Sequence, residues 1–334
     1  MIRVAINGFG RIGRIAFREM ITSRDFDIVA INDLSTAEEL CHLVKYDTVH
    51  RRFHEDAITF LNDELIIAGK KRIKVFSESK PSNLPWKKLD IDLVLECTGV
   101  FKDEDKAIEH INAGAKKVLV SAPSKGNVKT IVYGVNESIL DGSELIVSAS
   151  SCTTNCLAPL LNVIDKNFGI VKGFMTTIHA FTNDQVTLDI AHKKGIKSRR
   201  GRAASQNIIP TSTGAATSIG LVIPKLDGKM NGYSYRVPVS DGSLVEVVLE
   251  LENDATVEKI NEVFKNNQNE TIKFTTDPIV SSDVVGTRVG SLVDGLLTSV
   301  VEVDNKKLYK VVAWYDNELG YTCQMLRVAK EMFK

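Results

Sequence analysis

A glycine-rich segment near the N-terminus restricts the possible folds of this chain more than any other feature. NGFGRIG places Gly8, Gly10 and Gly13 in the spacing G-x-G-x-x-G, between a strand-like run at residues 3–8 and a helical pattern at 11–21. In that setting the glycines allow a tight turn, a close approach of a pyrophosphate to the backbone, and packing of the helix on the strand. The N–H groups at the helix start would face the phosphates. The segment predicts a dinucleotide-binding βαβ unit.

An acidic residue further along indicates which dinucleotide is bound. Asp33 ends the next strand-like run, at residues 27–33, and follows the third glycine by twenty positions. A carboxylate there accepts hydrogen bonds from both hydroxyls of the adenosine ribose and repels a 2′-phosphate, which favours NAD over NADP. The alternative is an ordinary βαβ turn in which Asp33 caps a helix. The complete strand–turn–helix context favours NAD.

The hydrophobic pattern changes near residue 150. Before it, strand-like and helical segments alternate, which predicts parallel strands joined by helices. Those segments are strands at 91–99, 116–123 and 144–150 and helices at 36–46 and 103–114, the first helix opening with the capping-box spacing Thr36–Glu39. Beyond it, Val245, Val247, Leu249 and Leu251 alternate with mostly acidic residues, which predicts an antiparallel sheet with one wet face.

We therefore predict an α/β protein with a Rossmann-type parallel-sheet domain and an α+β domain whose sheet is mostly antiparallel. Further strands of that second sheet are expected at 295–303 and 308–314, and helices at 256–267 and 318–333. The predicted domains are 1–151 with 317–334, where the C-terminal helix returns to the first domain, and 152–316. A chain of 334 residues is long for one core, which agrees with two domains.

Composition excludes several classes of protein. Lys plus Arg equal Asp plus Glu at 42 each, so the zero net charge gives no support for nucleic-acid binding. There is no apolar run of 18 residues to suggest a membrane span, and the N-terminal segment lacks the apolar core of a signal peptide. Five scattered cysteines do not suggest a disulfide framework. We expect a soluble cytoplasmic protein.

The segment SASSCTTNC holds the candidate nucleophile. Cys152 stands between the predicted strand 144–150 and a predicted helix at 152–168, where free N–H groups and the helix dipole should lower the pKa of its thiol. Cys156 lies one turn deeper, in an apolar setting that keeps a thiol inert. A metal site would need two more close ligands, and two cysteines four apart in one helix are poorly placed to form a disulfide. We predict one reactive thiol and no metal.

A nucleophilic cysteine needs a base. His179 lies near the end of a strand-like run at 173–182, just after the cysteine helix, and a strand–helix–strand arrangement can bring the two together. His42 and His110 fall in helical patterns, where surface or partly packed positions are expected. Sequence order alone does not decide the choice of His179.

Seven segments in order resemble one enzyme family. They are INGFGRIGR, IND, SCTTNCLAP, TTIHAFTNDQ, STGAA, RVP and WYDNE. Together they are similar to the phosphorylating glyceraldehyde-3-phosphate dehydrogenases over essentially the whole chain.

The resemblance implies a glycolytic reaction and a homotetramer. Cys152 would attack the aldehyde of glyceraldehyde 3-phosphate, with His179 as general base, and hydride would pass to NAD. Inorganic phosphate would then cleave the thioester to give 1,3-bisphosphoglycerate.

The resemblance also implies the binding residues. Besides the three glycines and Asp33, the cofactor contacts would be Asn7, Arg11, Ile12, Thr98, Ser121 and Asn317. The ligands of the substrate phosphate would be Thr182 and Arg236, and those of inorganic phosphate Ser151, Thr153, Thr213 and Gly214.

A basic loop completes the predicted phosphate site. HKKGIKSRRGR, residues 192–202, carries Lys193, Lys194, Lys197, Arg199, Arg200 and Arg202 and no acid. These charges should raise the local concentration of anions. The loop leaves open which arginine contacts phosphate, and Arg200 is the one we predict.

Some residues depart from the family pattern, and alternatives remain. Ala149 and Ser150 replace the usual Asn and Ala, and Ala191 replaces a Pro that helps to exclude NADP in relatives. The nearest alternative is erythrose-4-phosphate dehydrogenase, which hydrolyses the thioester; Thr213–Gly214 and Asp33 argue against it. An NADP-preferring form, a Cys–His hydrolase without cofactor and a secondary binding role are the others.

Overall fold

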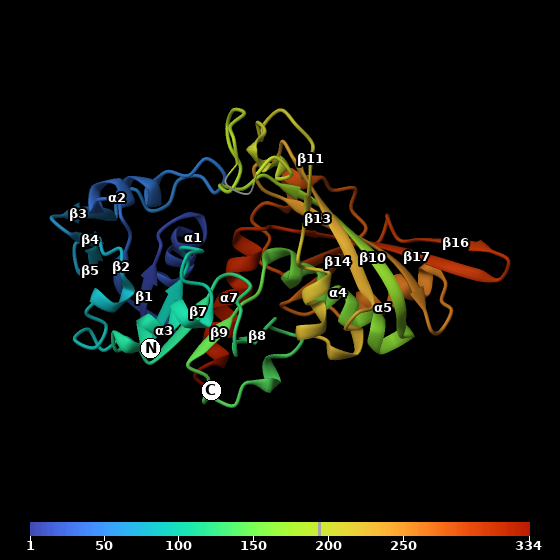
Figure 1. Ribbon diagram of the computed structural model, residues 1–334, viewed down its shortest axis with the longest axis horizontal. Coiled ribbons are helices and arrows are strands. Elements are labelled where there is room, and N and C mark those ends of the chain that lie inside the picture. The colour runs from blue at the N-terminus through green and yellow to red at the C-terminus, as the bar shows by residue number, and fades with distance from the viewer. Residues whose placement is uncertain (193–194) are drawn as a thin grey trace. The chain divides into compact units, whose positions relative to one another are not determined.

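The computed structural model describes residues 1–192 and 195–334, and these form two compact units (Figure 1). The first comprises Met1–Ile131, Glu137–Ser151 and Met325–Lys334, and the second Val132–Asn136 and Cys152–Gln324. Lys193 and Lys194 of the predicted basic loop lie outside the described residues. Within the described ranges, no helix has the length and apolar character needed to cross a bilayer.

A largely parallel sheet forms the centre of the first unit. Its strands are β1 (Ile2–Asn7), β2 (Phe26–Asn32), β3 (Ile58–Leu61), β4 (Glu64–Ile67), β5 (Lys71–Phe76), β6 (Leu93–Glu96), β7 (Lys117–Val120), β8 (Lys129–Thr130) and β9 (Ile146–Ser148). Their order across the sheet is β3-β4-β5-β2-β1-β6-β7-β9-β8. The parallel sheet predicted for the first half is confirmed; β3 to β5 form an antiparallel edge that was not predicted.

The helices of the first unit include those that follow β1, β2 and β6. They are α1 (Arg11–Met20), α2 (Ala37–Lys45), α3 (Glu104–Asn112), part of α7 (Leu319–Glu331), and the short 3-10 helices η1 (Pro81–Asn83) and η2 (Glu137–Ile139). The predicted capping box is present, because Thr36 accepts from the Glu39 N–H and the Glu39 carboxylate accepts from Thr36. α1 packs on β1 and β2, while α3 packs on β7 and β9.

The strand order turns at β1, which has β2 on one side and β6 on the other. The chain thus runs outward to one edge and returns to build the other half of the sheet. Ligands of such sheets bind beyond the carboxyl ends of the strands at this point. The fold therefore places the residues after β1, β2 and β6 where a ligand would lie.

The second unit contains a mixed, mostly antiparallel sheet. Its strands are β10 (Ile170–Ala180), β11 (Ile209–Ser212), β12 (Met230–Val237), β13 (Ser243–Leu251), β14 (Ile272–Thr275), β15 (Ser291–Asp294), β16 (Ser299–Val303) and β17 (Lys306–Tyr315). The order is β11-β12-β10-β13-β17-β15-β14, with β16 paired to β17. The predicted α/β class with a mostly antiparallel second sheet is confirmed, and the parallel pairs β10–β12 and β14–β15 refine it.

One face of this second sheet forms the core. Along β13 the residues from Val245 to Leu251 alternate between buried and partly exposed, as predicted. The buried side packs against α4 (Cys152–Phe168), which contacts β10, β13, β15 and β17. The remaining helices are α5 (Val257–Asn266), α6 (Ser281–Val284), η3 (Arg199–Gly201), η4 (Thr217–Leu221) and η5 (Pro224–Leu226).

Candidate functional site

A pocket of about 440 Å³ opens in the first unit at the carboxyl ends of β1, β2 and β6. Its lining includes predicted cofactor residues from all three strand ends. The lining residues are Asn7, Gly8, Gly10, Asn32, Asp33, Leu34, Glu78, Ser79, Cys97, Thr98, Val100 and Phe101. The pocket lies where the topology of the sheet predicts a ligand.

The three glycines fit the roles expected of a pyrophosphate turn. Gly8 has φ of +87°, and a Cβ there would lie 2.7 Å from the backbone N of Thr98. A Cβ on Gly13 would lie 2.1 Å from the carbonyl oxygen of Gly8, so helix α1 can pack this closely only with glycine. Apart from Gly10 itself and its two chain neighbours, no residue has an atom within 4 Å of a Cβ placed on Gly10, which leaves space for a ligand. These residues fit the pyrophosphate of a dinucleotide.

Asp33 joins the glycine turn to the end of β2. Its Oδ2 accepts from the backbone N–H of Phe9 at 2.7 Å, and its Oδ1 accepts from that of Ser35 at 3.0 Å. The alternative in which Asp33 caps α2 is wrong, because Thr36 is the N-cap. The carboxylate is partly exposed in the pocket wall, where it can accept ribose hydroxyls.

The other predicted cofactor residues divide into three groups. Asn7 and Thr98 line the pocket, whereas Arg11, Ile12 and Ser121 lie outside that lining. Arg11 pairs with the carboxylate of Asp47 through both guanidinium nitrogens. Ser121 donates from Oγ to the backbone carbonyl of Glu96 at 3.0 Å. Asn317 belongs to the second unit.

The predicted nucleophile and base lie together in the second unit. Cys152 is the first residue of α4, His179 lies at the end of β10, and Sγ is 3.4 Å from Nε2. His179 is 3% exposed, and its Nδ1 lies 2.7 Å from the carbonyl oxygen of Ala180. Because a carbonyl can only accept, Nδ1 carries the proton and Nε2 presents a lone pair to the thiol. The imidazole is thus oriented to accept the proton of the thiol.

Burial disfavours an isolated charge on either group. It raises the pKa of the Cys152 thiol, against the effect of the positive Arg236, and it lowers the pKa of His179 to about 3, with Arg236 adding to the effect. The lowered thiol pKa predicted from the helix start is therefore not found in the free protein, since desolvation outweighs the attraction of Arg236. Opposite charges on the two groups would stabilise each other, and hydrogen bonds from the Thr153 N–H and hydroxyl also favour the thiolate.

Cys156 is the inert neighbour that the sequence predicts. It is fully buried, and its Sγ lies 3.7 Å from the Oγ of Ser291. Burial raises the pKa of this thiol far above its ordinary value. All five cysteines are free thiols.

The parallel pairing of β10 and β12 brings an arginine beside the base. Arg236 is the cross-strand neighbour of His179, and its Nη1 donates to Thr182 Oγ1 at 2.6 Å and to the carbonyl of Ala180 at 3.2 Å. Thr182 in turn donates to Asp184, which also pairs with Arg200. Burial would raise the pKa of Asp184, but the Thr182 hydroxyl and the two arginines hold it below its ordinary value.

The residues predicted to bind inorganic phosphate are more dispersed. Thr153 is buried, with its Oγ1 3.1 Å from the hydroxyl of Tyr315, which also lies 2.8 Å from Thr177 Oγ1. Thr213 and Gly214 lie on the turn after β11, where Thr213 Oγ1 accepts from the N–H of Ala215. Ser151 directly precedes α4.

The segment just before Cys152 contains a residue with an unusual backbone conformation. Ser150 is fully buried and has φ of +60°, in the left-handed region that favours glycine. It stands two positions before Cys152.

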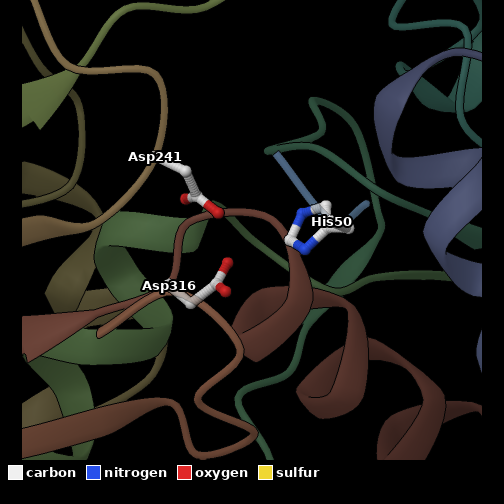
Figure 2. A group of neighbouring side chains, drawn as sticks. All are labelled: His50, Asp241 and Asp316. Carbon is white, nitrogen blue, oxygen red and sulfur yellow. The ribbon is translucent and has the colours of Figure 1, made fainter. Parts of the chain in front are cut away.

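Asn317 comes directly after Asp316, whose carboxyl group is paired with that of Asp241. Its Oδ1 accepts from Ser243 Oγ at 2.6 Å, and Ser243 accepts from the N–H of Ala180 at 3.0 Å. Figure 2 shows the carboxyl groups of Asp241 and Asp316 turned toward each other. Burial and the negative charges of Asp316 and Glu318 raise the pKa of Asp241, so that it can donate to Asp316.

Asp316 is itself an acceptor for the surrounding backbone. Its carboxylate accepts from the N–H groups of Gly286, Glu318 and Leu319 at 2.7 to 2.9 Å. The carboxyl pair therefore holds the turn that carries Asn317.

Sequence reasoning missed several residues around both sites. Asp184, Tyr315 and Asp241 are the main ones in the second unit; Asp184 and Tyr315 lie inside motifs quoted above, so inspection of each polar residue in those motifs would have found them. The surface or partly packed position expected for His110 is wrong: it is 0% exposed, whereas His42 is exposed as expected.

Comparison with known proteins agrees with this geometry. Residues 2–104 match the glyceraldehyde 3-phosphate dehydrogenase NAD-binding domain, and residues 151–317 match the C-terminal domain of the same enzyme. The chain is 52% identical, over all of its length and 99% of the relative, to a protein of Clostridium pasteurianum named glyceraldehyde-3-phosphate dehydrogenase. Proteins of the same name from Clostridium acetobutylicum and Lactobacillus delbrueckii subsp. bulgaricus are 53% and 48% identical, each over 98% of this chain and 97% of the relative. Two family models over most of the chain and full-length relatives near 50% identity establish that it belongs to the glyceraldehyde-3-phosphate dehydrogenase family.

Proposed function

We propose that this protein oxidises D-glyceraldehyde 3-phosphate to 1,3-bisphosphoglycerate in glycolysis, with NAD and inorganic phosphate as co-substrates. The observation that carries the proposal is the Cys152 thiol, 3.4 Å from the unprotonated Nε2 of the buried His179. Family membership and the names of the relatives support the choice of substrate.

The first step forms a covalent adduct on the thiol. The Cys152 sulfur bonds to the aldehyde carbon while His179 Nε2 accepts the thiol proton. The imidazolium then gives this proton to the carbonyl oxygen, which yields a thiohemiacetal and leaves His179 neutral. The raised pKa of the thiol and the lowered pKa of the imidazole favour the neutral forms of both groups, so we propose that the proton moves as the C–S bond forms.

Oxidation and phosphorolysis follow at the same carbon. NAD, when bound, supplies the acceptor for the hydride that leaves this carbon. His179 takes the hydroxyl proton, and the product on Cys152 is a thioester. An oxygen of inorganic phosphate attacks the thioester, the C–S bond breaks, and the proton returns to the sulfur.

The two phosphates would be held by different residues. Arg236 and Thr182 support a site for the substrate phosphate, because a guanidinium and a hydroxyl already meet there at 2.6 Å. Arg200, now paired with Asp184, would add a second positive charge. We assign inorganic phosphate to Ser151, Thr153, Thr213 and Gly214.

We propose that residues 1–151 with 317–334 are the domain for NAD binding, although residues 317–324 belong to the second compact unit, and that 152–316 serve catalysis and oligomerisation. Free thiols at all five cysteines fit a reducing compartment, and we place the protein in the cytoplasm.

The catalytic domain also offers a surface for a homotetramer. On the sheet face away from α4, Phe174 is 64% exposed and Tyr233 of the neighbouring strand is 62% exposed. Exposed aromatic side chains gathered on one face indicate a protein interface. Sedimentation equilibrium should give four subunits, and a monomer at micromolar concentration would contradict this part of the proposal.

The test of the reaction is NADH formation from glyceraldehyde 3-phosphate with and without inorganic phosphate. We expect turnover that depends on phosphate. Turnover indifferent to phosphate and faster with erythrose 4-phosphate would point to erythrose-4-phosphate dehydrogenase, and oxidation without any NAD requirement would exclude both.

A further inference from the structure

We infer that Glu96, His110 and Trp86 are positioning residues for the cofactor pocket, acting through Asn7 and Thr98. The inference rests on the proposed use of NAD. It begins from a buried polar network in the first unit that the proposed chemistry does not use.

The centre of the network is the carboxylate of Glu96, at the end of β6. Its side chain is 0% exposed, as is that of His110. Oε1 accepts from the backbone N–H of Thr98 at 2.8 Å and from the Thr98 hydroxyl. Oε2 accepts from Asn7 Nδ2 at 2.5 Å and lies 3.1 Å from His110 Nε2. Four donors around two oxygens match the acceptor capacity of a carboxylate.

Trp86 determines which nitrogen of His110 carries the proton. The indole Nε1 lies 3.0 Å from His110 Nδ1, and an indole N–H can only donate. Nδ1 is therefore the acceptor, and Nε2 carries the hydrogen that is donated to Glu96. The ring planes differ by 24° and the centroids are 6.4 Å apart, so the hydrogen bond joins the two rings edge to edge and orients the imidazole.

The network ends on residues that line the pocket. Asn7 accepts at Oδ1 from Asn32 Nδ2 at 2.7 Å, so its Nδ2 is directed to Glu96. Asn32 also bonds to the backbone of Glu78 in both directions. These contacts connect the ends of β1, β2 and β6 beneath the lining of the pocket.

Thr98 transmits the position of Glu96 to the glycine turn. Its hydroxyl accepts from the N–H of Val100 at 3.0 Å, which shapes the following turn. A Cβ added to Gly8 would lie 2.7 Å from the backbone N of Thr98, so the glycine turn and the segment that carries Thr98 are in close contact. Movement of Thr98 would therefore change the space beside Gly8, where we place the pyrophosphate.

The test measures NAD binding directly. Glu96→Gln places an amide N–H₂ where two donors now meet, so unpaired donors should move Asn7 or Thr98. We expect the Kd for NAD, measured by calorimetry, to rise about tenfold. The rate at which iodoacetamide alkylates Cys152 in the absence of NAD should stay unchanged, because that thiol belongs to the other unit.

Variants of His110 separate positioning from simple loss of packing. His110→Ala should weaken NAD binding, and His110→Gln should restore part of it, because Gln can donate to Glu96 and accept from Trp86. His42→Gln, on the exposed face of α2, is the matched control and should bind NAD like the wild type. Equal Kd values for Glu96→Gln, His110→Ala and wild type, with only a lower Tm, would overturn the inference.

A spectroscopic measurement gives an independent readout. The ¹⁵N chemical shifts of the histidine side chains should show His110 protonated at Nε2, and Trp86→Phe should allow the Nδ1–H form to appear. A wild-type His110 protonated at Nδ1 would overturn the inference. A wild-type protein that does not bind NAD would instead refute the proposed function, so the two failures are distinguishable.

Discussion

Each of the two units contains a buried histidine, and the two rings carry their proton on opposite nitrogens. His179 in the second unit carries its proton on Nδ1, held by a backbone carbonyl, and turns the lone pair of Nε2 toward a thiol. His110 in the first unit accepts at Nδ1 from an indole and turns an N–H at Nε2 toward a carboxylate. The same ring is a proton acceptor in one place and a fixed donor in the other.

The difference lies in the neighbour of Nδ1. A carbonyl oxygen and an indole N–H have opposite hydrogen-bonding roles, and each fixes the opposite tautomer. In the first unit the buried polar groups around His110 form hydrogen bonds with one another, which suits a binding surface. The second unit keeps a thiol and a base in contact with neither charge favoured alone, which suits a reaction.

The largest expected effect concerns the thiol. Cys152→Ser should lower turnover on the order of 10⁴-fold, because a hydroxyl is a far weaker nucleophile at neutral pH. NAD binding by calorimetry should remain. Cys156→Ser, four residues away and buried, is the matched control and should keep most of the activity; equal losses in both variants would show that the helix, not the nucleophile, had been damaged.

Removal of the second-unit base should have the next largest effect. His179→Gln should reduce turnover about 10³-fold at saturating NAD, the range expected for loss of a general base. It should also slow alkylation of Cys152 at pH 7, since the buried thiol must then release its proton to water. His110→Gln at saturating NAD should show neither change. Similar turnover and alkylation rates for the two variants would contradict the distinction between His179 as a base and His110 as a positioning residue.

A change in the first unit should alter cofactor choice and leave the thiol untouched. Asp33→Ala removes the charge that repels a 2′-phosphate, and the ratio of kcat/KM for NAD to that for NADP should fall at least about tenfold. Alkylation of Cys152 should proceed at the wild-type rate. An unchanged cofactor ratio would refute the role of Asp33 at the ribose.

The smallest effect concerns stability near α1. Burial alone would raise the pKa of Asp47, but its hydrogen bonds and ion pair with Arg11 lower it to about 2. Because the pKa of Asp47 is lower in the folded state than in the unfolded chain, the ionised carboxylate stabilises the fold above about pH 4. This contribution is lost as the pH falls toward 2.

Asp47→Asn should therefore reduce the free energy of unfolding by about 2 kcal/mol at pH 7 and by little near pH 2. Urea denaturation across pH 2 to 7 provides the measurement. If the difference in unfolding free energy between the two proteins did not shrink in acid, packing and not charge would be what stabilises the contact between Asp47 and α1.

The sequence predicted the sheets well where periodicity carried the information. Helix α4 has the predicted bounds of Cys152–Phe168, and β13 has its predicted buried face. The short strand β3 was missed because Ile58–Leu61 has one buried residue and no clear alternation, whereas β5 does alternate and was overlooked. The parallel pair β10–β12 was missed because the pairing of distant strands leaves no local pattern.

The candidate sites show the same limit. Family motifs placed Cys152 and His179, and their contact requires two segments 27 residues apart. The position of His110 was misjudged because a helical pattern with few apolar residues suggests a surface helix, whereas Trp86 and Glu96 satisfy its ring inside the protein. Tautomers depend on partners far along the chain, so no local pattern encodes them.

The positive φ at Ser150 has a consequence for engineering. Ser150 in the left-handed region lowers the folding stability by about 1 kcal/mol or somewhat more, because its Cβ is strained there. Glycine would remove this strain but lower the stability by about as much, because it gives the unfolded chain more conformational entropy to lose on folding. The two terms nearly cancel, so Ser150→Gly should be close to neutral in melting temperature. What changes is stiffness: serine has fewer accessible backbone conformations. At position 150, just ahead of the nucleophile, the stiffness of the backbone can thus be changed with little effect on the stability of the enzyme.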